Sequence, residues 1–407
     1  MIKRILYTLL IMFPVVASAQ INTDRVMAIG RNALYFEDYV LSIQYFNQVI
    51  NAKPYLSDPY FYRGLAKINL DDFQGAESDC SEAIERNPFV VSAYQVRGLA
   101  RIQQNNFAGA IEDYTKALEF DPENIGVWHN MALCRIRQED YKGAKNDLDK
   151  LIAISPRYTK AYLMRGEVDL KQKDTLAAEK DFGKAIEIDR YDADTWASRA
   201  ILRLQQQRYK DAEADFDHAI RLSTRNSGVY INRALARYHQ NNLRGAMSDY
   251  DIALDIDPNN FIGHYNRGLL RAQVGDDNRA IQDFNFVIEM EPDNMMAIFN
   301  RGLLLDQTGD YKGAIKDYST VINEYPNFLL GYQYRAQARR KIGDVKGADA
   351  DEFKVLKAQL DKQNGVDPNK QTADNTENNK TRKKSDKNMN NYRKIVVADN
   401  EEGEEKI

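Results

Sequence analysis

The stretch Phe299–Pro326, FNRGLLLDQTGDYKGAIKDYSTVINEYP, predicts two short amphipathic helices joined by a turn. Gly309 and Asp310 form the turn, and Pro326 ends the second helix because proline cannot continue it. A lone helical hairpin of this length cannot bury its apolar face, so it needs copies of itself on both sides.

The chain supplies such copies at a constant spacing of 34 residues. The eighth position of each copy is Gly or Ala, and the twentieth is Ala in every copy but the first. Large, mostly aromatic residues recur at the fourth and twenty-fourth positions, where they can fill the space beside the small ones. Ten repeats follow without insertion or deletion, at 23–56, 57–90, 91–124, 125–158, 159–192, 193–226, 227–260, 261–294, 295–328 and 329–362.

This pattern closely resembles the tetratricopeptide repeat (TPR) family over residues 23–362. The resemblance implies an all-α fold, a right-handed α-solenoid superhelix of ten contiguous 34-residue helix-turn-helix repeats. It also implies that the first helix of each pair lines a concave face that holds peptides or partner proteins. The final helix, near 345–360, is charged on one side, and we interpret it as a solvating cap.

The N-terminus predicts targeting rather than fold. Lys3 and Arg4, a short apolar run and an A-x-A motif match a signal peptide over residues 1–19, cleaved near Ala19-Gln20. An uncleaved anchor helix is the alternative. We therefore expect an exported protein, in the periplasm, outside the cell or on its surface, with no transmembrane segment in the mature chain.

The C-terminus, 363–407, predicts a disordered polar tail, because its few apolar side chains cannot offset the entropy lost on ordering. The short apolar stretch around Ile395, Val396 and Val397 allows a second interpretation. It is a linear motif that docks on a partner or on the chain's own superhelix.

Arg recurs at the seventh position of the repeat and Asp at the twenty-third, which we interpret as a structural ion-pair ladder; a basic stripe for an anion is the alternative. Met131 stands at the Arg position of repeat four, so pairing within a repeat leaves only Asp147 unmatched. Pairing each Asp with the next repeat's Arg would strand Arg63, Asp113 and Asp351, so we predict pairing within the repeat. The predicted ladder is Arg63, Asp79, Arg97, Asp113, Arg165, Asp181, Arg199, Asp215, Arg233, Asp249, Arg267, Asp283, Arg301, Asp317, Arg335 and Asp351.

In repeats seven to nine the predicted concave face is unusually apolar and carries a row of asparagines. An Asn amide can bond an extended backbone through both its donor and its acceptor, and the neighbouring rings and leucines could take apolar side chains. We predict a groove for an extended peptide or a partner helix; in the alternative, these side chains contact neighbouring repeats. The candidate residues are Asn232, Asn266, Asn300, Ile231, Tyr265, Phe299, Leu235, Leu269 and Leu303.

The sequence offers little support for catalysis. A net charge of -4 provides no global basic field for nucleic acid. The four histidines fall in different repeats without metal-ligand spacing, and no phosphate loop or nucleophile motif is present. Cys80 and Cys134 lie two repeats apart and should be buried free thiols. We expect no catalytic residue, metal, cofactor or nucleic-acid partner.

The predicted function is a non-catalytic protein–protein interaction scaffold of the cell envelope that binds peptides or partner proteins on its concave face. One alternative is a structural or assembly subunit of an envelope complex, which contacts partners through its convex face or its ends. An enzyme with cryptic chemistry would require titratable groups that converge in one pocket. The sequence indicates neither the partner's identity nor the oligomeric state.

Overall fold

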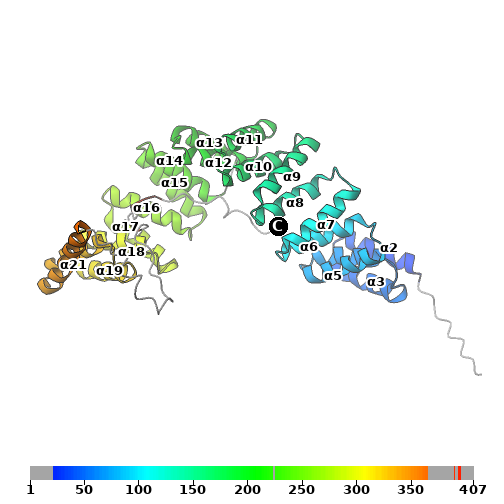
Figure 1. The fold of residues 1–407 in the computed structure, drawn as a ribbon, viewed down its shortest axis with the longest axis horizontal. Coiled ribbons are helices and arrows are strands. Elements are labelled where there is room, and N and C mark those ends of the chain that lie inside the picture. The colour runs from blue at the N-terminus through cyan, green and yellow to red at the C-terminus, as the bar shows by residue number, and fades with distance from the viewer. Residues whose placement is uncertain (1–21, 223–224, 365–388, 390–392, 396–407) are drawn as a thin grey trace, which may run out of the picture. The chain divides into compact units, whose positions relative to one another are not determined.

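The computed structural model describes residues 22–222, 225–364, 389 and 393–395, and these residues contain helices and turns but no strand. The predicted signal peptide, most of the predicted tail, Val396 and Val397 lie outside the described residues. The helices, α2 to α21, fall into two compact bodies of five hairpins each, α2–α11 and α12–α21 (Figure 1).

In the N-terminal body, each first helix is followed by a second helix of similar length. The first helices are α2 (Thr23–Tyr35), α4 (Asp58–Ile68), α6 (Val91–Gln103), α8 (Ile125–Arg137) and α10 (Thr159–Lys171). The second helices are α3 (Tyr39–Ala52), α5 (Phe73–Arg86), α7 (Phe107–Phe120), α9 (Tyr141–Ile154) and α11 (Thr175–Ile188).

The C-terminal body repeats this arrangement. Its first helices are α12 (Ala193–Gln205), α14 (Ser227–His239), α16 (Phe261–Gln273), α18 (Met295–Thr308) and α20 (Leu329–Lys341). Its second helices are α13 (Tyr209–Arg221), α15 (Leu243–Ile256), α17 (Asp277–Met290), α19 (Tyr311–Glu324) and α21 (Val345–Gln363). Within each body, every helix packs against the next one in sequence, so the predicted all-α helical repeat fold is confirmed.

Small residues facing large rings hold each hairpin together. The side chains of Phe182 and Tyr318, at the twenty-fourth position, are fully buried. A Cβ atom added at Gly166 would lie 2.5 Å from the Phe182 ring, and one added at Gly302 would lie 2.9 Å from the Tyr318 ring. The small eighth position is therefore required by the close approach of the two helices.

Each hairpin turn contains one residue in the left-handed region, always at the fifteenth position. Glycine occupies it at Gly275, Gly309 and Gly343. In the other repeats a residue with a side chain adopts φ between 58° and 65°, and these are Glu37, Asp71, Asn105, Glu139, Lys173, Gln207 and Asn241. The following residue commonly caps the second helix, as in Asp310, whose Oδ1 accepts from the Gly313 N–H at 3.0 Å.

The final helix departs from the expected cap. The exposed side of α21 carries the apolar side chains of Phe353, Leu356 and Leu360, one or two turns apart. Its outer face is therefore only partly polar, although Glu352 of α21 does form an exposed ion pair with Arg340 of α20.

Replacing Lys173 by Gly should raise the free energy of unfolding by roughly 0.5–1 kcal/mol, because a Cβ atom disfavours the left-handed conformation. The matched control is Lys180→Gly, an exposed position inside α11, which should lower it by about 1 kcal/mol. Urea unfolding of the full chain measures both. A loss of stability in Lys173→Gly would contradict the role assigned to the turn.

Candidate functional site

The arginines at position seven each bind the aspartate at position twenty-three of their own repeat. In Arg165, Nε and Nη2 donate to the two carboxylate oxygens of Asp181 at 2.6 and 2.7 Å. This hydrogen bonding raises the pKa of Arg165. The structure places together Arg63 and Asp79, Arg97 and Asp113, Arg165 and Asp181, Arg199 and Asp215, Arg233 and Asp249, Arg267 and Asp283, Arg301 and Asp317, and Arg335 and Asp351.

A second basic residue, at position eleven, reaches the same carboxylate. Arg237 Nη1 lies 2.9 Å from Asp249, whose side chain is almost fully buried. The expectation that Asp147 would be unmatched is wrong, because Arg135 Nε lies 2.7 Å from it. The basic residues at position eleven that contact the aspartate of their own repeat are Lys67, Arg101, Arg135, Arg203, Arg237, Arg271 and Arg339.

Most arginines at position seven also bond a residue of the preceding repeat. The third donor of Arg165, Nη1, lies 2.6 Å from Asp149, at position twenty-five of the preceding repeat. The corresponding acceptors elsewhere include Asn47 for Arg63 and Ser81 for Arg97. These residues are hydrogen-bond acceptors but chemically different from one another, so the sequence pattern did not reveal them.

His264 replaces the ring found at position four in other repeats. Its ring stacks on Phe286 with centroids 4.0 Å apart. Its Nδ1 also lies 3.0 Å from Asp283, which the sequence did not indicate. Burial alone would raise the pKa of Asp283, but hydrogen bonds from His264 and Arg267 bring it below its ordinary value. This carboxylate is therefore held ionised inside the protein.

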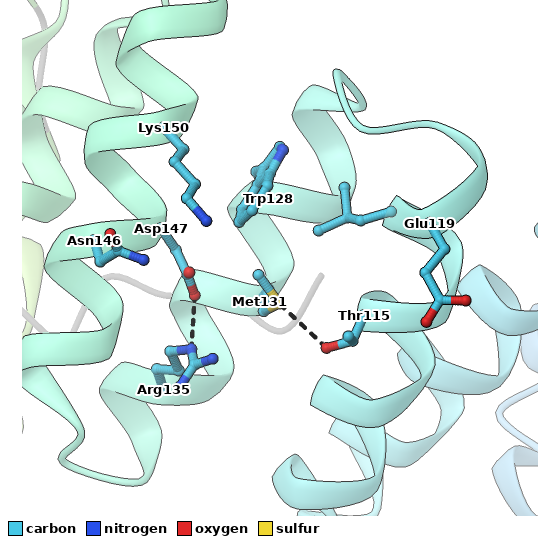
Figure 2. A pocket seen from close by; sticks show the side chains of 9 residues that line it. Thr115, Glu119, Trp128, Met131, Arg135, Asn146, Asp147 and Lys150 are labelled. Atoms are coloured by element: carbon cyan, nitrogen blue, oxygen red, sulfur yellow. Dashed lines mark hydrogen bonds and ion pairs between the residues drawn. The ribbon is translucent and has the colours of Figure 1, made fainter.

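Repeat four carries the aspartate at position twenty-three but no arginine at position seven, and a hollow lies there. A pocket of about 340 Å³ lies between α7, α8 and α9. Figure 2 shows the side chains that line it. Thr115, Met131 and Asp147 line it. Met131 stands at the position of the arginine, and Thr115 and Asp147 stand at the positions of its acceptors in repeats such as repeat five. Arg135 points to Asp147 from one side, and Lys150 lies over the Trp128 ring at 4.8 Å (Figure 2). The hollow is the space left by a missing arginine.

One pair between repeats has its charges reversed. Arg101 and Arg237, at position eleven, each reach back to a glutamate of the preceding repeat, Glu77 or Glu213, at 2.8 Å. In repeat five the position holds Asp169, which is buried and paired with Lys145 of repeat four.

Lys145→Glu alone and Asp169→Arg alone should each lower the free energy of unfolding by about 1–3 kcal/mol, because each brings like charges together at a partly exposed site. The double variant should recover most of this loss, since it restores the orientation of the Arg101–Glu77 pair. A double-mutant cycle in urea gives the coupling free energy. Additive losses would contradict the pairing.

The predicted groove residues at position five are largely buried. Ile231 lies in a cluster with Tyr250 and Leu270, inside the stack of hairpins. Phe299 meets the Phe328 ring edge-on, with centroids 5.0 Å apart. Ile231 therefore contacts neighbouring repeats, as the alternative interpretation stated, and does not line an open groove.

The asparagines at position six are buried too. Asn232 and Asn266 are fully buried, and neither appears among the buried side chains that lack a hydrogen-bond partner in the described part of the chain. Asn300 Nδ2 donates to the Met296 carbonyl at 2.9 Å and to Tyr265 Oη at 3.4 Å. These amides therefore do not form an open row.

Position nine carries the apolar surface that remains partly open. We call Ile201, Leu235, Leu269 and Leu303 the apolar face, since they hold the same position on α12, α14, α16 and α18. Leu235 is buried, and the other three are half-buried.

Two side chains from beyond the array lie in the same clusters as the apolar face. Ile395 belongs to the cluster that contains Leu235, with Ile201 and Leu269 packed against it. Met389 belongs to the cluster of Phe299, with Leu303 packed against it. Both are buried, at 7% and 1% exposure.

The other three histidines pack against aromatic rings, and the two cysteines lie in the core. His218 stacks on Trp196, and His239 stacks on Tyr209. His129 meets the Tyr158 ring edge-on. Cys80 and Cys134 are free and fully buried, as predicted, and burial raises the pKa of each thiol to about 12.

Neither thiol should react with an aromatic disulfide reagent at pH 8, because only roughly one thiol in 10⁴ is then ionised. Both should react after unfolding in urea. Absorbance of the released thiolate counts the reactive groups. A native chain that reacts at the rate of free cysteine would contradict the burial.

Over the described ranges, no three His, Cys, Asp or Glu side chains gather where they could hold a metal ion. None of the described helices has the length and apolar character needed to cross a membrane.

The stacked hairpins, their left-handed turns and their buried Arg–Asp pairs define a helical repeat protein, an α-solenoid. Sequence profiles of the family agree: a TPR repeat profile matches residues 98–134, and tetratricopeptide repeat profiles match 125–158, 159–192, 198–261 and 265–327. Together these matches cover more than half of the chain, which belongs to the tetratricopeptide repeat family.

Several solved structures are similar to this chain. A tetratricopeptide repeat protein from Parabacteroides merdae is 21% identical over 61% of this chain and 98% of its own, with a TM-score of 0.48. The C-terminal part of a TPR repeat-containing protein from Cytophaga hutchinsonii is 18% identical over 58% and 97%, with a TM-score of 0.49. YrrB, described as a TPR protein with an unusual peptide-binding site, is 18% identical over 45% and 95%, with a TM-score of 0.41. No curated protein matches the chain.

Proposed function

We propose that this TPR protein is a non-catalytic scaffold that binds extended peptide segments of partner proteins on the apolar face of its C-terminal body. Membership of the family supports a role in protein–protein interaction. One observation carries the finer proposal: the side chains of Met389 and Ile395, which lie outside the array, are buried in the clusters of the apolar face.

The apolar face is built to receive a chain without rearranging. Its side chains project from helices that are held in place by the buried Arg–Asp pairs, such as Arg233 with Asp249 on α14 and α15. A preformed surface loses little conformational entropy on binding, so more of the contact free energy appears as affinity. The partner should present large apolar side chains in an extended segment, rather than a charged tail.

The proposed location is the cell envelope or the cell surface. The support is the sequence of residues 1–19, with its basic start, apolar run and A-x-A motif. Fractionation of the producing cells, together with N-terminal sequencing of the mature protein, tests it. A chain that begins at Met1 in the cytosol would contradict the location but leave the binding proposal intact.

A second function, assembly through the ends of the array, has its own support. The first hairpin exposes Tyr35 and Phe36, at 81% and 76%, and the last helix exposes Phe353 at 66%. Apolar side chains this open at both ends could bury one another between copies. Sedimentation velocity over a range of protein concentrations distinguishes assembly from peptide binding alone. Assembly through the ends requires that the native chain associate as its concentration rises, and that Phe36→Asp abolish this association.

Peptides selected on the full chain from a phage-displayed random library should depend on the apolar face. The double variant Leu269→Asp/Leu303→Asp should weaken their binding at least about tenfold, equivalent to about 1.4 kcal/mol, because a carboxylate replaces an apolar contact. The measurement is fluorescence anisotropy with the selected peptide, after circular dichroism has shown an intact fold.

The matched control is Leu65→Asp/Leu99→Asp, which changes the same repeat position on α4 and α6 of the N-terminal body. It should leave peptide binding unchanged. Equal weakening in both double variants, or none in either, would refute the proposed site.

A further inference from the structure

The chain returns to its own array after the last helix has ended. α21 ends at Gln363, yet Met389 is buried against repeat nine, in the cluster of Phe299 and Phe328. Ile395 is buried against repeats six and seven, in the cluster of Ala197 and Leu235. Each of the two clusters includes residues of the apolar face or has them packed against it: Leu235 with Ile201 and Leu269 in one, and Leu303 in the other.

We propose that the C-terminal segment of the chain is the resident ligand of the apolar face, anchored by Met389 and Ile395, so that a partner must displace it. This proposal rests on the proposed function, because it names what occupies the same surface. It favours one of the interpretations of the tail that the sequence left open, docking on the chain's own superhelix.

The pattern of burial around the anchors is that of a bound linear segment. Arg393 and Lys394 are exposed, whereas Ile395 beside them is buried. An apolar side chain inserted into a surface, directly after charged residues that face solvent, is the usual arrangement of an extended ligand on a groove-like surface. A segment that merely followed the array as a spacer would have no reason to bury its two apolar anchors and leave the charges out.

The spacing of the anchors sets the register of the ligand. Met389 and Ile395 are six positions apart in the sequence, and a fully extended chain of that length spans at most about 20–22 Å. The cluster of Met389 belongs mainly to repeat nine and that of Ile395 to repeats six and seven, so the later anchor lies against the earlier repeats. A competing partner should therefore offer two large apolar side chains about six residues apart, in the same orientation.

Tethering makes the contact both persistent and reversible. A ligand on the same chain acts at an effective concentration on the order of millimolar, so even a weak segment covers its site most of the time. Two anchors bury little surface compared with a stable protein interface, so a partner with more contacts can replace them.

A thiol reporter on the apolar face tests the proposal in the full chain. Leu303→Cys and, separately, Leu269→Cys provide the only accessible thiol in the described residues, because Cys80 and Cys134 are buried. The rate of maleimide labelling should be low with the native tail. It should rise about tenfold or more when Met389→Asp and Ile395→Asp are added, since the covered fraction of the face falls.

The matched control is Lys394→Asp, which changes an exposed residue beside an anchor and should leave the labelling rate low. A synthetic peptide with the sequence of residues 387–397 should slow labelling of the Met389→Asp/Ile395→Asp chain again. Equal labelling rates with native and altered anchors would overturn the proposal. Protection that falls as the protein is diluted would overturn it as well, because it would assign the ligand to a second copy.

Failure here is distinguishable from failure of the proposed function. If the anchors do not alter labelling but selected peptides still require Leu269 and Leu303, the face binds peptides and the tail does not occupy it. If selected peptides ignore Leu269 and Leu303, the proposed function itself is lost.

Discussion

The guanidinium at position seven of the repeat joins the two helices of its own hairpin and, in most repeats, the preceding hairpin as well. In repeat five, Arg165 holds the buried carboxylate of Asp181, bonds Asp149 of the preceding repeat and lies over the Tyr162 ring. Removing one partner from such a site leaves a buried charge uncompensated, which typically costs about 3–5 kcal/mol. The pairs therefore fix how hairpins sit on one another more than they add to the net stability.

The parts of the fold set by local, repeated contacts could be predicted from the sequence. The period of the small and large positions, such as Gly302 opposite Tyr318, is visible because each hairpin meets the same packing demand. The distribution of Arg and Asp among the repeats was enough to predict that each Asp pairs with the Arg of its own repeat and not with that of the next repeat. The second basic residue that binds the aspartate, at position eleven, could not be predicted. A basic residue such as Arg237 that pairs with a buried carboxylate has the same sequence pattern as one that faces solvent.

The candidate site was harder to predict for a related reason. Apolar residues on a first helix serve both the stack and the open surface, and their spacing does not separate the two roles. Ile231 and Leu235 lie one turn apart, yet only Leu235 shares a cluster with a residue from beyond the array. Met389 and Ile395 carry no periodicity, so only the three-dimensional structure relates them to the face that they cover.

Because the repeats are so similar, a hairpin could pack against the wrong neighbour, and the reversed pair of Lys145 and Asp169 disfavours this. Nearly identical hairpins could mispair during folding, because the Arg–Asp contacts of one neighbour are interchangeable with those of another. Asp169 facing Glu77 or Glu213, or Lys145 facing Arg101 or Arg237, would bring like charges together. A slip of the fourth and fifth hairpins along the array is therefore penalised electrostatically, and the exchanged pair distinguishes the contact between repeats four and five from the corresponding contacts elsewhere.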